Sequence, residues 1–108
     1  MTVNELSAKC GFKAIALPDG EKEVKGGYAG DLLSWVMGRA KDGCAWITIM
    51  SNVNIIAVAS LADVACIILS EGVGVDESVT ATAEEKGVNV LSSELTTYEI
   101  AALIGKYI

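Results

Sequence analysis

Two apolar stretches indicate the fold of this sequence: Cys44-Ala45-Trp46-Ile47-Thr48-Ile49 and Val64-Ala65-Cys66-Ile67-Ile68-Leu69. The first is apolar nearly throughout and the second is wholly apolar. Such runs are typical of strands that are covered on both faces, as in a parallel sheet. Residues 52–62 between them are long enough for a crossover helix, with Ser51 or Asn52 as its expected N-cap. The central part of the chain therefore predicts a βαβ unit.

The same alternation of strands and helices extends over the whole chain. Capping boxes at Thr2–Glu5 and Thr96–Glu99 and an expected N-cap at Asp31 mark helix starts. The other expected elements are a short helix that ends at Gly11, strands over Phe12–Leu17, Glu21–Tyr28 and Val88–Leu91, and helices over Leu32–Ala40, Asp76–Lys86 and from Thr96 onward. This pattern predicts one α/β domain over residues 1–108, with a mostly parallel central sheet and helices on both faces. The order of the strands stays open.

Composition restricts the class of protein. The chain has 108 residues, of which 52% are hydrophobic, and a net charge of −6 with a pI near 4.5. A negative chain repels phosphate backbones and anionic lipids, so we expect neither nucleic acid nor a membrane as the main partner. No signal peptide and no apolar run of about 18 residues is present, which predicts a cytoplasmic location.

The reactive residue types are few. There is no histidine, which excludes Ser-His-Asp and Cys-His catalysis, and no Walker loop is present. The three cysteines, Cys10, Cys44 and Cys66, are far apart and set among apolar residues, so we expect reduced, packed thiols without metal. We therefore expect no catalytic residues, no metal site and no enzymatic activity.

Short polar side chains follow the expected parallel strands, where ligands of open α/β sheets bind. They are Thr48, Ser51, Asn52 and Asn54 after one strand, Ser70 and Glu71 after the next, and Ser92, Ser93 and Glu94 after the last. One interpretation is a hydroxyl-rich ligand site. The alternative is that these residues only cap helices.

A glycine-rich segment is the other candidate site. Gly26, Gly27 and Gly30 surround Tyr28 and precede Asp31. Glycines are costly to order, so they suggest close approach of the backbone to a turn, a neighbouring strand or a ligand. The Tyr28 ring is suited to stacking on a base.

The crossover helix suggests a second subunit. Its apolar residues, from Val53 to Ala62, occupy nearly the full circumference, whereas a core-facing stripe of about 100° is sufficient for burial. We expect a homodimer that uses either this helix or the helix over Leu32–Ala40. Packing within one chain is the alternative.

Several segments together resemble the DRTGG domain family, over about residues 3–103. The resemblance rests on Gly26-Gly27-Tyr28-Ala29-Gly30-Asp31-Leu32-Leu33-Ser34-Trp35-Val36-Met37, Ala45-Trp46-Ile47-Thr48, Asn54-Ile55-Ile56-Ala57-Val58-Ala59 and Ala65-Cys66-Ile67-Ile68. Within the family, the sequence resembles small stand-alone members encoded near clostridial-type iron-only hydrogenase genes. The five letters that name the family do not occur in it.

The resemblance implies a fold and a role. The family is similar to the N-terminal domain of HPr kinase/phosphorylase. In regulated pyrophosphatases such a domain lies between nucleotide-binding CBS domains, and paired domains form an interface that accepts a diadenosine polyphosphate. By resemblance, the chain is expected to dimerise and to bind an adenine nucleotide. The matched positions are Gly26, Gly27, Tyr28, Asp31, Leu32, Ser34 and Asn54, and the nearby bases are Lys25, Arg39 and Lys41.

Two functions remain as main alternatives. The first is a non-catalytic regulatory or sensory domain, homodimeric and linked to hydrogenase or redox metabolism, with a protein partner from that system. The second is a binding module for adenine nucleotides such as a diadenosine polyphosphate. A kinase-related fragment is a weaker third alternative, because nothing in the sequence holds ATP phosphates.

Overall fold

Five strands form one sheet in the order β1-β5-β4-β3-β2 in a computed structural model that describes residues 1–108. The strands are β1 (Lys13–Ala16), β2 (Gly26–Ala29), β3 (Cys44–Thr48), β4 (Cys66–Leu69) and β5 (Val90–Ser92). β2, β3, β4 and β5 are mutually parallel, and only β1, at one edge, is antiparallel to its neighbour β5. The mostly parallel α/β fold predicted from the sequence is therefore confirmed, and the structure supplies the strand order.

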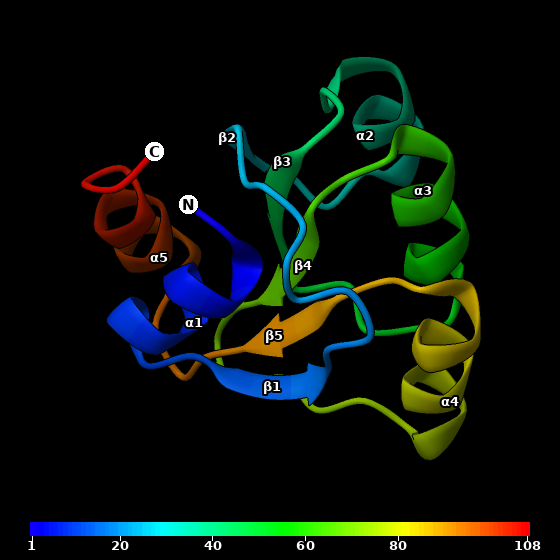
Figure 1. Cartoon of the computed structure of the whole chain (residues 1–108). Helices are drawn as coiled ribbons and strands as arrows, with labels where there is room; N and C mark the ends of the chain where they lie inside the picture. The colour runs from blue at the N-terminus through cyan, green and yellow to red at the C-terminus, as the bar shows by residue number, and fades with distance from the viewer.

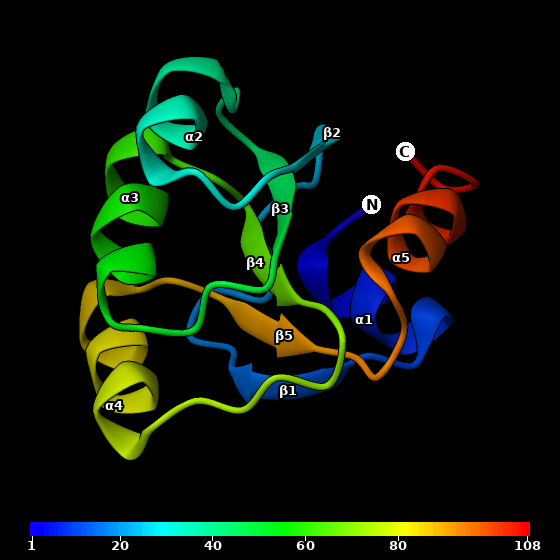
Figure 2. The same ribbon diagram turned by 180° about the vertical axis from the view of Figure 1, so that it is seen from behind.

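Helices cover both faces of the sheet (Figures 1 and 2). One face carries α2 (Leu33–Arg39), α3 (Asn54–Ala62) and α4 (Glu77–Lys86), and the other carries α1 (Val3–Cys10) and α5 (Thr97–Ile104). Successive residues of a strand point to opposite faces. Trp46 of β3 accordingly packs in the core beneath α2, α3 and α4, while Ile47 packs in the core beneath α1 and α5.

Two helix starts follow the sequence signals. Thr2 and Glu5 form a capping box at α1, and Thr96 and Glu99 form one at α5. In each, the threonine hydroxyl accepts from the glutamate N–H, and the glutamate carboxylate accepts from the threonine N–H. These reciprocal bonds satisfy two of the free N–H groups of each helix start.

Two expected helix starts are wrong. Asp31 does not cap α2, because its carboxylate accepts hydrogen bonds from the loop after β3, and the capping position is Leu32 without a side-chain bond. Neither Ser51 nor Asn52 is the N-cap of α3, whose capping position is Val53. The Asn52 side chain instead accepts from the Asn54 N–H, a local turn that competes with capping.

The expected strand over Glu21–Tyr28 is shorter than predicted and spans only Gly26–Ala29. The residues before it cross the amino ends of the strands, held by contacts from their side chains and backbone. Glu23 pairs with Thr2 in an isolated bridge, and the Lys22 ammonium lies 2.6 Å from the Asp63 carboxylate. These contacts tie the segment to the start of α1 and to the end of α3.

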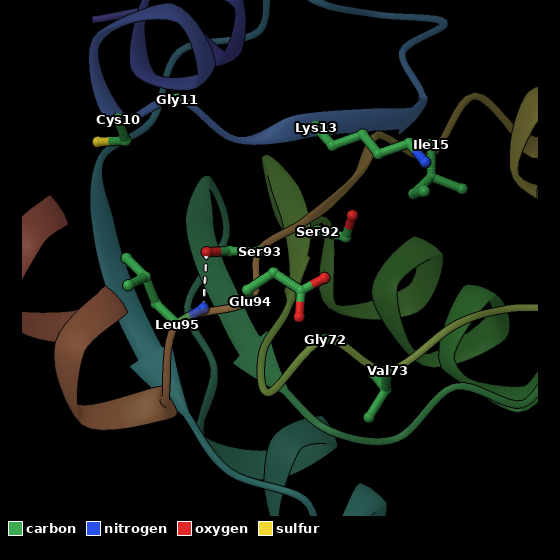
Figure 3. Close-up of a pocket in the computed structure, with 10 residues that line it drawn as sticks. All are labelled: Cys10, Gly11, Lys13, Ile15, Gly72, Val73, Ser92, Ser93, Glu94 and Leu95. Atoms are coloured by element: carbon green, nitrogen blue, oxygen red, sulfur yellow. Dashed lines mark hydrogen bonds between the residues drawn. The ribbon is translucent and has the colours of Figure 1, made fainter.

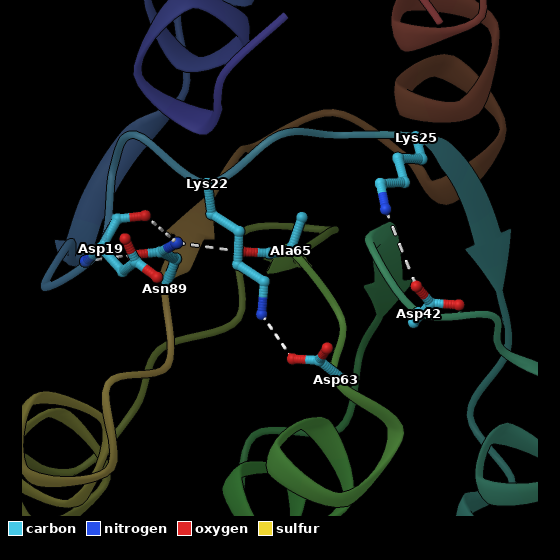
Figure 4. A network of polar contacts seen from close by, with 7 residues as sticks. All are labelled: Asp19, Lys22, Lys25, Asp42, Asp63, Ala65 and Asn89. Atoms are coloured by element: carbon cyan, nitrogen blue, oxygen red, sulfur yellow. Dashed lines mark hydrogen bonds and ion pairs between the residues drawn. The ribbon is translucent and has the colours of Figure 1, made fainter.

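Polar groups at the amino edge of the sheet are paired (Figure 4). Asn89, which is buried before β5, donates to the backbone oxygens of Asp19 and Ala65 and accepts from the Asp19 N–H. These bonds join the turn after β1 to the start of β4, and they satisfy a side chain that would otherwise be costly to bury.

All three cysteines are free, as expected. Cys44 and Cys66 are buried in β3 and β4, and burial raises the pKa of the Cys66 thiol to about 12. No group of three metal-ligating side chains lies together, and none of the helices is both long and apolar enough to cross a bilayer.

Candidate functional site

The carboxyl ends of β2 and β3 are joined by Asp31. Its Oδ1 atom accepts from the Thr48 hydroxyl at 2.9 Å and from the Ile49 N–H at 3.0 Å. Thr48 is fully buried and its Oγ1 atom also accepts from the Met50 N–H. Both side chains therefore hold the loop after β3.

The carboxyl ends of β4 and β5 are joined by a second set of bonds. The buried Ser70 hydroxyl lies 2.7 Å from the Thr97 hydroxyl, and the N–H groups of Glu71 and Gly72 donate to the backbone of the loop after β5. Glu71 adopts the left-handed conformation, with φ at 61°. A non-glycine residue seldom takes this conformation, so the loop is strained at this position.

The largest cavity, of about 500 Å³, lies beside these loops and β1 (Figure 3). Lys13 and Glu94 line it with opposite charges, together with the hydroxyls of Ser92 and Ser93. The Ser93 hydroxyl accepts from the Leu95 N–H, and the Glu94 carboxylate lies over Gly72, where a Cβ atom would clash with it. This mixed lining shows no excess of positive charge.

A second cavity, of about 390 Å³, lies at the start of β2, between this strand and the end of α2. Its floor includes Gly26 and Gly27, which bring no side chain, and Tyr28, which is half-buried. The basic residues Lys25, Arg39 and Lys41 line it together with one acid, Asp42. The cavity thus has a local net charge of +2 in a chain whose net charge is −6.

The charged side chains of this basic cavity are accessible. The Arg39 guanidinium stacks 3.7 Å from the centre of the exposed Trp35 ring, which restrains its position. Lys25 lies 3.8 Å from Asp42 in a solvent-exposed ion pair of small energetic value (Figure 4). Three cations that line a cavity together with two glycines form an arrangement suited to an anion.

The structure brings only some of the predicted site residues together. Gly26, Gly27 and Tyr28 line the basic cavity, whereas Asp31 and Thr48 bond to each other at the opposite end of the strands. The others are dispersed: Ser34 is exposed on α2, Ser51 and Asn52 lie before α3, Asn54 borders a groove between α3 and α4, and Glu71 is exposed in the loop after β4. These positions do not form one continuous site.

The sequence places Arg39 and Lys41 a few residues after the glycine-rich segment, but it does not predict that they line the same cavity. Their convergence with Gly26 and Gly27 depends on the parallel register of β2 and β3, which pairs Gly26 with Cys44. Lys13 was missed as a cavity residue, because the antiparallel pairing of β1 with β5 had no local signal.

Comparison of the sequence and the fold with known proteins identifies the family of the chain. No curated protein sequence matches the chain significantly. Among solved structures, the fold is similar to the CBS and DRTGG domains of the regulatory region of Clostridium perfringens pyrophosphatase, complexed with its activator diadenosine tetraphosphate. The TM-score is 0.74 at 12% identity, over 95% of this chain and 45% of that one, so this chain spans less than half of that structure. The sequence profile of the DRTGG domain matches residues 29–107. The chain therefore belongs to the DRTGG domain family, as the resemblance predicted.

Proposed function

We propose that this chain is a non-catalytic regulatory domain that binds an adenine nucleotide in the basic cavity at β2. The observation that carries the proposal is that Lys25, Arg39 and Lys41 line one cavity together with Gly26 and Gly27. The volume of this cavity, about 390 Å³, lies within the range of about 300–1,000 Å³ typical of small-molecule sites. Membership of the DRTGG family and the nucleotide activator bound by the similar regulatory region support the same ligand class.

Each lining group has a chemical role in this proposal. The three cations contact the phosphates, the absence of side chains at Gly26 and Gly27 lets phosphate oxygens approach the backbone, and the Tyr28 ring stacks on the adenine. The Asp42 carboxylate lies 3.8 Å from the Lys25 ammonium. A nucleotide that competes for Lys25 breaks this contact, which couples binding to the loop between α2 and β3.

The proposal includes a homodimer. Large apolar side chains are exposed on α2, at its capping position and at both ends of α3, namely Leu32, Trp35, Met37, Val53 and Leu61. An exposed group of this kind is typical of an association surface. A two-fold symmetric diadenosine polyphosphate also suits two equivalent cavities. The link with hydrogenase or redox metabolism and the cytoplasmic location stay predictions.

Titration calorimetry with AMP, ADP, ATP and diadenosine tetraphosphate, with and without magnesium, tests the ligand. We expect saturable binding of at least one of them. Arg39→Gln and Lys41→Gln should each weaken it at least about tenfold, since a hydrogen bond to a charged group contributes about 1.5–3 kcal/mol. Lys9→Gln on α1, outside the cavity, is the matched control.

Three results would overturn parts of the proposal. No heat with any nucleotide would exclude the ligand class, and equal binding by the Arg39→Gln/Lys41→Gln double variant would exclude this cavity. Light scattering of the same samples at tens of micromolar tests the dimer. A monomeric mass with and without the ligand would exclude it.

A further inference from the structure

The strand β2 leaves one edge of the sheet open. The strand order ends with β2, and no backbone pairs with its outer side. The Gly30 N–H donates to the Ile47 oxygen at 3.1 Å, and Ala29 pairs with Ile47, so the alternation of a parallel ladder directs the N–H groups of Gly27 and Ala29 away from β3. Unpaired N–H and C=O groups of this kind are a template for a further strand.

Cavities flank this edge on both faces of the sheet. The basic cavity lies on the face to which Tyr28 points, against the core beneath α2 and α3. A second, apolar cavity of about 200 Å³ lies on the other face, between β2 and the end of α5. A Cβ atom on Gly27 would lie 3.4 Å from Ile104 of α5, which places Gly27 on that face. The apolar walls are Ala29, Ile47, Ala101, Ile104 and Ile108.

The two linings specify what a strand added at this edge would carry. Side chains of a strand alternate between the two faces of a sheet. Every second side chain of an added strand would thus meet Lys25, Arg39 and Lys41, and the others would meet the apolar cavity. Charge complementarity favours acidic residues on the first face, and burial favours small or branched apolar residues on the second.

We propose that the β2 edge binds an extended peptide segment of a partner protein, with alternating acidic and apolar residues, by strand addition. A second copy of this chain is a poor occupant, because its own edge residues Gly26–Ala29 carry no carboxylate to pair with the cations. The inference goes beyond nucleotide binding. The peptide's acidic residues would share Lys25, Arg39 and Lys41 with the phosphates, so that nucleotide and peptide exclude each other.

A synthetic peptide tests this directly, with the sequence acetyl-Thr-Glu-Val-Glu-Val-Glu-Thr-amide. Titration into the isotopically labelled chain should shift the amide signals of residues 26–29 in a saturable manner. A peptide with lysine in place of each glutamate should bind at least tenfold more weakly. Unchanged signals at residues 26–29 with the glutamate peptide would overturn the proposal.

Backbone methylation separates strand addition from simple charge attraction. In one peptide the alternate amide nitrogens that face β2 are N-methylated, and in the other the intervening ones are. We expect the peptide that is methylated on the nitrogens facing β2 to lose binding, and the other peptide to retain it. Equal binding by both would contradict strand addition, as would a concentration-dependent dimer that broadens residues 26–29 without peptide.

Protein variants separate this proposal from the nucleotide site. Ile108→Ser alters the apolar cavity at the exposed end of the chain, where no change in folding is expected. It should weaken the glutamate–valine peptide severalfold and leave nucleotide affinity unchanged. Arg39→Gln should weaken both ligands. Peptide binding that is insensitive to Ile108→Ser would place the peptide elsewhere, whatever the nucleotide result.

Discussion

The strands β3 and β2 are adjacent and in register, but their surroundings differ. All five residues of β3 are buried, whereas β2 alternates between half-buried and exposed residues and begins with two glycines. β3 contributes to the cores on both faces of the sheet, and β2 borders two cavities. The comparison indicates that stability is concentrated at the centre of the sheet, and that surface available for recognition is concentrated at its edge.

The largest expected loss of stability distinguishes the two tryptophans. Trp46 in β3 is fully buried and donates from its ring N–H to the Gly30 oxygen, whereas Trp35 on α2 is 52% exposed. Trp46→Ala should lower the free energy of unfolding by about 3–5 kcal/mol, because it leaves a cavity in the core. Urea denaturation followed by circular dichroism measures this. Trp35→Ala is the matched control.

At a protein concentration where the chain is monomeric, the control should cost less than about 1 kcal/mol, since an exposed ring loses little on removal. If Trp35→Ala destabilised the chain as much as Trp46→Ala, the comparison between centre and edge would fail. A loss at Trp35 that appears only at concentrations where the chain dimerises would instead place this ring on the proposed dimer surface.

The centre was predictable from sequence, whereas much of the edge was not. Apolar runs such as Ile67–Leu69 predict a buried strand without further information. The capping box of Thr96 and Glu99 is equally local, because its two residues lie within one helical turn. The sequence around Asp31 predicts a helix cap, but its partners in the structure are Thr48 and Ile49, which are distant in sequence and reach it only through strand pairing. The basic cavity depends on the same long-range register.

An intermediate effect tests how the edge is joined to the centre. Asp31→Ala removes the acceptor of the Thr48 hydroxyl and the Ile49 N–H, and leaves the buried hydroxyl hydrogen without a partner. We expect a loss of about 1–3 kcal/mol in the free energy of unfolding, measured as above. Asp31→Asn, which keeps an oxygen acceptor, should lose less. Equal losses would show that the negative charge, and not the hydrogen bonds, joins β2 to β3.

The smallest expected effect lies at the ion pair of Lys22 with Asp63 at the amino edge. The hydrogen bond and charge of Lys22 lower the pKa of Asp63, so this carboxylate stabilises the fold at neutral pH, and the contribution disappears as pH falls through its folded-state pKa, below the usual value of about 3.9. Asp63 is largely exposed, and solvent screening limits the effect of Asp63→Asn to about 0.5 kcal/mol or less. Asparagine also tolerates the left-handed backbone found at this position.

Urea denaturation of both proteins between pH 7 and pH 3 should show that the difference in the free energy of unfolding becomes smaller toward acid. A difference that grew toward acid would mean that the pKa of Asp63 is raised and not lowered. A loss above about 1 kcal/mol at pH 7 would mean that this exposed pair stabilises the fold as much as buried contacts do, against the contrast between the centre of the sheet and its edge.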